Sequence, residues 1–423
     1  MSSRAIMRPS TVVEAHTSPG YEHALELLRR CVTPDGFLAS TTPQENYKRV
    51  WSRDGVVMGL AGLLTDDTTL HQSFFDTLRT LKENQGPHGE IPSNVDPSTK
   101  NVSYGGNTGR VDAGLWYVIG CGAYWRHTQD KHFLQTVLPS IEAITFLLGA
   151  WEYNNRGLLY VPETGDWSDE YIQHGYVLYD ELLYWRALSE VAGMYGALRH
   201  AGFDTVTKKL HALRNLIIDN YRFSDEACAQ GGAHAYHPIL YRKGCAEAVA
   251  GRQFWLSYFS PMGYGVRFDA LANIFVSLFG IANAEQSDRV DAYVADVVTD
   301  QPSMLLPAFH PVIGPSDPAW DNLQVSCWNA FKNGPYEYQN GGLWPYVTGC
   351  YVADLARRGK KDLARRYLEG IDRANALDAG GKEWGFYEYH HGKDRTPKGT
   401  RHQGWSAAAS VIGHHALQDH FFL

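Results

Sequence analysis

The chain has 423 residues, of which 44% are hydrophobic and 20% charged, and its formal net charge is −8. This composition is typical of a globular protein with a sizeable core and excludes a largely disordered chain. The acidic balance argues against nucleic acid and anionic membranes as partners, because both favour clustered Lys and Arg. No continuous apolar run reaches the roughly 20 residues that a membrane span needs, so we expect no membrane association.

Six cysteines are scattered along the chain in largely apolar contexts, and none forms a CxxC pair. Such cysteines are typical of reduced, buried thiols. The N-terminus lacks the continuous apolar core of a signal peptide. We therefore expect a cytoplasmic protein with one catalytic domain over residues 1–423, in which residues 1–18 form a flexible or peripheral segment. The cysteines are Cys31, Cys121, Cys228, Cys245, Cys327 and Cys350.

Amphipathic helices follow one another along the whole chain. The first, at 21–31, places Ala24, Leu25, Leu27 and Leu28 on one side. Strand-like alternation is sparse, so we expect an all-α fold of about twelve helices. The other helices are expected at 54–65, 68–83, 110–127, 129–150, 180–201, 204–221, 268–281, 284–299, 341–358, 360–377 and 402–419.

The connecting segments favour a closed ring over a solenoid. When the helices are taken in pairs, polar and aromatic segments precede each even-numbered helix, among them KRVWSRDG, ETGDWSDEYIQHGY and GPYEYQNGGLWP. If the even helices form the inner ring of an (α/α)6 barrel, these segments meet at one mouth, where helix N-termini suit hydroxyl-rich or carboxylate ligands. Ordinary capping loops are the alternative, but a cap needs one polar residue and no Trp, His or Glu beside it.

Aromatic residues make up 13% of the chain, which fits either a large aromatic core or a sugar site. Cleavage of a glycosidic bond needs an acid to protonate the leaving oxygen and a second carboxylate. Acids beside aromatic residues suit this task, because desolvation raises a carboxyl pKa. The segment from Glu163 to Tyr171 offers Asp166 and Asp169 around Trp167.

A second acid-rich segment places Glu388 between Tyr387 and Tyr389. The tripeptide Tyr336-Glu337-Tyr338 has the same local form, so composition does not single out Glu388. For any one of these acids the alternative is a helix cap or a solvated surface position.

The segment ETGDWSDEYIQHGYVLYDELLYWRAL resembles the stretch that carries the catalytic Asp in alkaline/neutral invertases and in the amylo-α-1,6-glucosidase part of glycogen debranching enzymes. This resemblance implies that Asp169 is the general acid. Processing α-glucosidases and glucosylglycerate hydrolases are more distantly similar, and their pattern implies Asp166 instead. The segment from Trp384 to Trp405 resembles the C-terminal invertase segment, which implies that Glu388 is the general base.

Three further segments extend the resemblance to glycosidases with an (α/α)6 barrel. VWSRDG is similar to their Arg-Asp pair, IPSN…YGGNTGRVDAGLWY to the debranching-enzyme segment, and NGGLWPYVTG to a shared G-x-W-P segment. The invertase Asp-Arg-Arg is replaced here by Asp169-Glu170-Tyr171, which leaves the substrate open. The substrate-binding residues we expect are Trp51, Arg53, Asp54, Asn107, Asp112, Trp116, Trp167, Gly342, Trp344, Tyr387 and Trp405.

These motifs predict an inverting glycoside hydrolase that acts on a small α-glucoside, such as sucrose, from its end. A sugar epimerase or isomerase, a disaccharide phosphorylase and a non-catalytic sugar-binding protein are the alternatives. We expect neither a metal nor a cofactor, because no HxxxH or HExxH spacing occurs and His390 and His391 are adjacent. The sequence is compatible with a monomer or a homo-oligomer.

Overall fold

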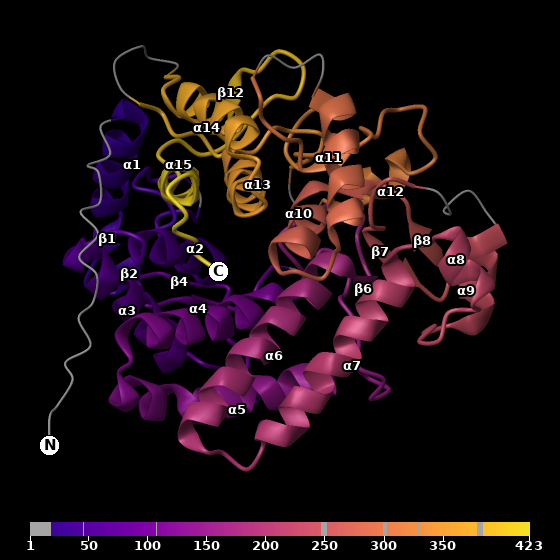
Figure 1. The fold of residues 1–423 in the computed structure, drawn as a ribbon. Helices are drawn as coiled ribbons and strands as arrows, with labels where there is room; N and C mark the ends of the chain where they lie inside the picture. Colours follow the sequence, from indigo (N-terminus) through magenta and orange to yellow (C-terminus); the bar gives the residue numbers. More distant parts are fainter. Residues whose placement is uncertain are drawn as a thin grey trace, which may run out of the picture.

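The computed structural model describes residues 18–44, 46–106, 108–246, 252–298, 303–327, 330–378 and 384–423. Each of the twelve predicted helices is present, and the helices form a ring of hairpins (Figure 1). The predicted (α/α)6 barrel is thus confirmed. Its inner helices are α2 (Ser52–Gly62), α4 (Asp112–Thr128), α6 (Leu178–Leu198), α10 (Ala270–Leu278), α13 (Pro345–Arg357) and α15 (Gly404–Ala416).

The inner helices contact one another in a closed circle. Along the circle α2 contacts α4, α4 contacts α6, α6 contacts α10, α10 contacts α13, α13 contacts α15, and α15 returns to α2. These helices have packing partners on all sides, and every residue of α2 is buried. A helix in this position must be apolar nearly all round, as the sequence predicted for the even-numbered helices.

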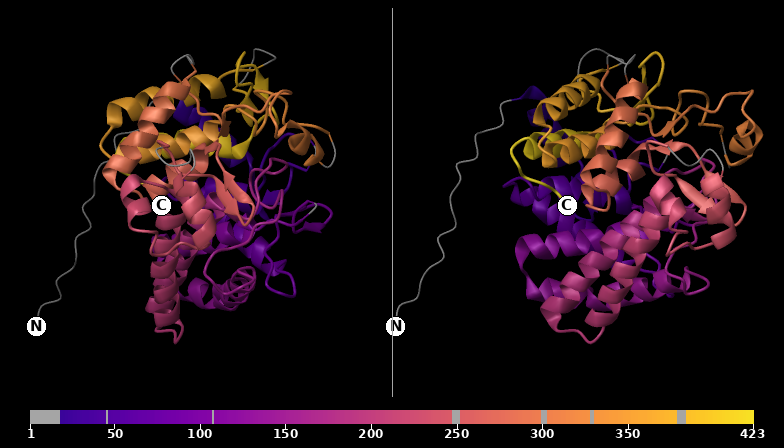
Figure 2. Two further views of the ribbon diagram at one scale, coloured as in Figure 1. Left: turned by 90° about the vertical axis from the view of Figure 1, so that its right-hand side faces the viewer. Right: turned by 45° about the vertical axis from the view of Figure 1, so that its right-hand side comes forward.

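The outer helices each pack one face against the inner ring. Helix α14, for example, buries Ala364, Leu368 and Ile371, which recur at helical spacing, and leaves charged residues on its other face. Helices α6 and α7 lie side by side along one flank of the molecule (Figures 1 and 2). The outer helices are α1 (Pro19–Arg30), α3 (Thr68–Glu83), α5 (Lys131–Ala150), α7 (Phe203–Tyr221), α11 (Ala284–Val298) and α14 (Lys361–Asn375).

Helix α5 is, by length and composition, able to cross a membrane, and it is the one such helix in the described part of the chain. This differs from the expectation that no segment is apolar enough. The helix packs against α4 and buries Phe133, Leu134, Ile141 and Leu148. About two fifths of its apolar stretch is buried in this way.

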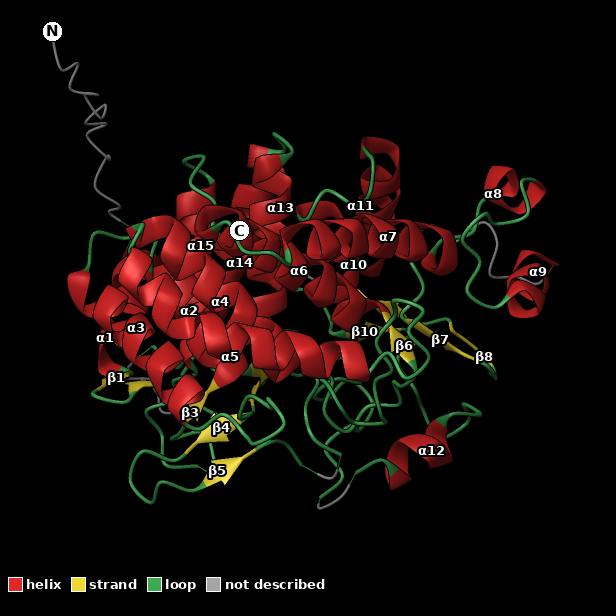
Figure 3. Ribbon diagram, turned by 90° about the horizontal axis from the view of Figure 1, so that it is seen from below, coloured by secondary structure: helices red, strands yellow, loops and turns green. Residues whose placement is uncertain are grey.

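Short antiparallel strands gather with the loops on one side of the helices (Figure 3). Strands β3, β6 and β9 lead directly into the inner helices α2, α6 and α10. The segments that precede inner helices therefore lie at one end of the barrel. The strands are β1 (Val32–Thr33), β2 (Gly36–Phe37), β3 (Val50–Trp51), β4 (Asn94–Val95), β5 (Val102–Ser103), β6 (Tyr176–Val177), β7 (Tyr258–Ser260), β8 (Gly263–Gly265), β9 (Phe268–Asp269), β10 (Phe309–His310), β11 (Tyr389–His390) and β12 (Pro397–Lys398).

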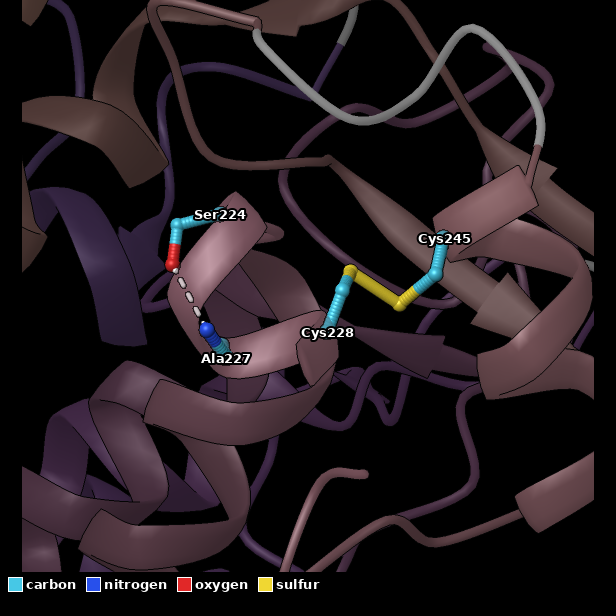
Figure 4. The surroundings of a disulfide bond; sticks show 4 residues. All are labelled: Ser224, Ala227, Cys228 and Cys245. Carbon is cyan, nitrogen blue, oxygen red and sulfur yellow. Dashed lines mark hydrogen bonds between the residues drawn. A yellow bond between two sulfur atoms is a disulfide. The ribbon is translucent and has the colours of Figure 1, made fainter. Parts of the chain in front are cut away.

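Three short helices were not predicted: α8 (Asp225–Ala229), α9 (Pro238–Ala246) and α12 (Trp320–Val325). A disulfide between Cys228 and Cys245 joins α8 to α9 (Figure 4). The prediction that all six cysteines are reduced is therefore wrong for this pair, which lies in an excursion outside the ring rather than in the core. The thiols of Cys31, Cys121 and Cys350 are free and buried, as predicted.

Candidate active site

A cavity of about 440 Å³ opens at the end of the barrel where the inner helices begin. Eight of the predicted site residues line it, although they lie far apart in the sequence. The segments that lead into α2, α6, α13 and α15 all contribute, so a shared mouth is present. The predicted residues in its wall are Trp51, Arg53, Asp54, Trp167, Asp169, Trp344, Glu388 and Trp405.

Glu388 is a buried carboxyl group at the wall of this cavity, directly before β11. The Tyr47 hydroxyl donates a hydrogen bond to its Oε1 at 2.7 Å, and the Thr400 amide donates to its Oε2 at 3.2 Å. Burial raises the pKa of Glu388 to about 7, although both hydrogen bonds oppose this rise. The carboxyl group can therefore gain or lose a proton near neutral pH.

Asp169 lies in the segment between α5 and α6 and faces the same cavity. Arg110 donates from Nη2 to its Oδ1 at 2.7 Å, and the Tyr338 hydroxyl donates to its Oδ2. We expected burial beside Trp167 to surround this carboxyl group with apolar surface. Trp167 is indeed fully buried, but the side chain of Asp169 is 22% exposed and forms an ion pair.

The two carboxyl groups lie in the wall of the same cavity, and the charge of Asp169 contributes to the raised pKa of Glu388. They belong to segments separated by more than half of the sequence, yet one cavity receives both. A sugar placed in this cavity would thus meet two carboxyl groups.

The Arg-Asp pair at the start of α2 lies in the wall of the cavity. Arg53 donates from Nη1 to Asp112 at 2.6 Å, and its guanidinium lies 5.8 Å from the centroid of the Trp405 ring. Gln403 donates to Asp54 at 2.7 Å. Burial raises the pKa of Asp54 to about 6, while the neighbouring Arg53 opposes the rise. Asp112 does not line the cavity, and it contacts Arg53 from behind.

Asp166 was the alternative candidate for the acid, but it does not line the cavity. Its Oδ1 accepts a hydrogen bond from the Ser168 amide at 2.7 Å, and its Oδ2 accepts one from Gln173 at 3.1 Å. These bonds fix the turn that carries Trp167 and Asp169. Burial raises the pKa of Asp166, and the group is 1% exposed.

Three other predicted ligands do not line the cavity. Trp116 is buried inside α4 and donates to the Tyr179 hydroxyl at 2.9 Å. Gly342 gives the backbone room, because a Cβ there would lie 2.3 Å from the Tyr338 carbonyl oxygen. Tyr387 accepts a hydrogen bond through its carbonyl oxygen from Ser406. The predicted ligand Asn107 lies outside the described residues.

Several cavity residues were not predicted. Tyr47, Arg110 and Tyr338 each contact one of the two carboxyl groups. Tyr338 belongs to the Tyr-Glu-Tyr segment that resembles the surroundings of Glu388, whereas Glu337 of that segment pairs with Lys398. The remaining residues of the wall are Asn46, Glu170, Ala330, Lys332 and Gln339.

Within the described ranges, no group of three or more His, Cys, Asp or Glu residues is arranged to hold a metal ion. Burial lowers the pKa of His390 to about 4, and His391 pairs with Asp394 at 3.2 Å. Neither histidine lines the cavity.

Comparison with known proteins gives a consistent result. Residues 252–420 match the family model described as alkaline and neutral invertase. The probable alkaline/neutral invertase D of Arabidopsis thaliana is 23% identical over 458 residues, which cover 95% of this chain and 83% of that protein. The chain is similar to the alkaline and neutral invertases. The predicted resemblance to this family is confirmed.

Solved structures confirm the fold. The GH63 mannosylglycerate hydrolase from Thermus thermophilus superposes with a TM-score of 0.64 at 13% identity, covering 93% of this chain and 99% of that one. A bacterial glucoamylase complexed with acarbose gives a TM-score of 0.64 at 14% identity, covering 95% of this chain and 56% of that one. The family model and the invertase relatives point to a glycosidase, as the sequence predicted.

Proposed function

We propose that this protein is an inverting glycoside hydrolase that removes the terminal glucosyl unit of a small α-glucoside, with sucrose as the first substrate to test. The observation that carries this proposal is the meeting of Asp169 and Glu388 at one aromatic-walled cavity. The similarity to alkaline and neutral invertases supports the choice of sucrose.

In this mechanism the glucosyl unit lies at the base of the cavity, against Arg53, Asp54 and the ring of Trp405. Asp169 donates a proton to the leaving oxygen. Glu388, in its ionised form, takes a proton from the water that attacks the opposite face of the sugar. An inverting enzyme needs roughly 6.5–9.5 Å between its two carboxyl groups to leave room for this water.

Arg110 pairs with Asp169 at 2.7 Å, whereas Glu388 has a pKa of about 7. For Asp169 to act on the leaving oxygen, the leaving group must take the place of Arg110 beside it. The raised pKa of Glu388 favours the exchanged assignment, in which Glu388 is the acid. We nevertheless prefer Asp169 as the acid, because the resemblance to invertases implies this role.

Glucosyl fluoride separates the two assignments, because fluoride leaves without a proton. If Asp169 is the acid, Asp169→Asn should lose sucrose hydrolysis but retain glucosyl fluoride hydrolysis, and Glu388→Gln should lose both. The reverse pattern would establish the exchanged assignment. Circular dichroism of both variants serves as the control for folding.

The function itself is tested with sucrose and a panel of α-glucosides, with the product anomer followed by NMR. We expect β-glucose to be released first. Initial release of α-glucose would refute inversion, and hydrolysis of none of the glucosides would refute the proposed function. Turnover that requires phosphate would instead indicate a phosphorylase.

We keep the cytoplasm as the proposed location, since one relative is named cytosolic invertase 1 of Oryza sativa. The Cys228–Cys245 disulfide argues in the other direction, because disulfides are rare in reducing compartments. Labelling of free thiols in protein isolated from its native cell would show whether this bond exists there.

A further inference from the structure

A second, smaller cavity of about 160 Å³ lies beside the first. Its wall comes from the segment before α4, the last turns of α5 and the chain that follows α5. Arg110 belongs to the walls of both cavities. The same Arg110 pairs with Asp169, so the second cavity adjoins the carboxyl group that we assign to the leaving oxygen.

Aromatic rings dominate the second cavity. Tyr104, Trp151, Tyr153 and Tyr160 line it. Tyr153 is 75% exposed, and its ring meets Tyr160 edge-on with 5.9 Å between the centroids. Its backbone has a φ of 53°, a left-handed conformation that costs energy for a bulky residue. This arrangement presents an aromatic face to solvent at the entrance of a cavity.

Polar groups complete the wall. Glu90 accepts hydrogen bonds from the amide and the Nδ1 atom of His88 at 2.9 and 2.8 Å. Its side chain is nevertheless 29% exposed. Thr108 and Arg110 also line this cavity. A carboxylate, a hydroxyl and a cationic side chain around aromatic rings can bind the hydroxyl groups and the C–H faces of a sugar ring.

We propose that the second cavity binds one further sugar ring of the substrate, on the leaving-group side of the bond that is cleaved. This inference rests on the proposed function. The leaving group must lie next to the acid Asp169, and a substrate that continues past Asp169 reaches Arg110 and then the second cavity. The substrate class is therefore a trisaccharide or longer oligosaccharide with a terminal α-glucosyl unit, rather than a disaccharide alone.

The test measures binding by calorimetry in the Glu388→Gln background, where turnover does not interfere. The probes are three pairs: sucrose and kestose, maltose and maltotriose, and isomaltose and isomaltotriose. We expect at least one trisaccharide to bind more tightly than its disaccharide. Adding Tyr153→Ala should weaken this trisaccharide about five- to tenfold, the range expected for loss of one aromatic contact, and leave the disaccharide unchanged.

Phe146→Ala is the matched control, because Phe146 is a 79% exposed aromatic residue on the neighbouring α5 and lines neither cavity. It should change the affinity for neither saccharide. Equal affinity within every pair, or a trisaccharide affinity that Tyr153→Ala leaves unchanged, would overturn the inference. Failure of the proposed function is a separate result, seen as absence of turnover by the wild-type enzyme.

Discussion

The hydrogen bond from Tyr47 to Glu388 should set the pH range of activity. Tyr47→Phe removes the hydroxyl that donates to Glu388 at 2.7 Å. A hydrogen bond to a charged group contributes about 1.5–3 kcal/mol, and one pKa unit corresponds to 1.36 kcal/mol. If a water molecule replaces the hydroxyl and restores part of this hydrogen-bond free energy, the pKa of Glu388 should rise by roughly one unit above its present value of about 7.

The sign of the effect follows from the role of Glu388 as a base. A base acts when it is ionised, so a higher pKa moves the acidic limb of kcat/KM to higher pH. With a pKa of about 7, half of Glu388 is ionised at neutral pH, and with a pKa one unit higher about a tenth is. We expect Tyr47→Phe to lower kcat/KM about fivefold at neutral pH and to leave the alkaline plateau unchanged.

The assay is a pH profile of sucrose hydrolysis from about pH 5 to about pH 10, with Tyr338→Phe as the matched control. Tyr338 lies in the same cavity but donates to Asp169, so its loss should leave the acidic limb in place. An acidic limb that does not move in Tyr47→Phe would refute the reasoning. Movement of the alkaline limb instead would contradict this prediction and favour the exchanged assignment, which the glucosyl fluoride experiment then tests.

Three further changes test the structure around the cavity. Asp112→Ala leaves Arg53 as an unpaired buried charge, so urea unfolding should show a loss of about 3–5 kcal/mol and KM should rise. Cys228→Ser opens a loop of 17 residues and should cost up to about 3 kcal/mol, but kcat should be retained because the cavity wall contains no residue of α8 or α9. Glu388→Gln should flatten the pH dependence of stability. In the wild type the pKa of Glu388 rises from 4.5 to about 7 on folding, so the free energy of unfolding should fall by about 3 kcal/mol as pH increases through this range. The variant lacks this contribution.

The helices were predictable because their hydrophobic periodicity is local. The expected helix at 68–83 coincides with α3, and the one at 204–221 differs from α7 by a single residue. Helices α8 and α12 have five and six residues, which is too short for a helical repeat of hydrophobic residues to be recognised in the sequence. The disulfide between α8 and α9 was missed for a similar reason, because its two cysteines are 17 residues apart in a pattern that fits no common motif.

The candidate site was predictable to the extent that family motifs mark it. Asp169 and Glu388 were found through motifs, and the cavity contains both. Tyr47, Arg110 and Tyr338 were missed because their importance lies in contacts across 341, 59 and 169 residues of sequence. Such contacts become visible only when the ring brings its loops together.

The arrangement that forms the cavity also has a cost in stability. The inner helices begin where the cavity opens, and burial raises the pKa of Asp54 to about 6 and of Asp269 and Glu388 to about 7. Each of these acids is neutral in the folded state at a pH where it would be ionised in the unfolded chain, so folding becomes less favourable as pH rises from about 4 to about 7. The Glu388 base, however, needs the upper end of this range. The contribution of Glu388 to folding is therefore most favourable below the pH at which this group is ionised and can act as a base.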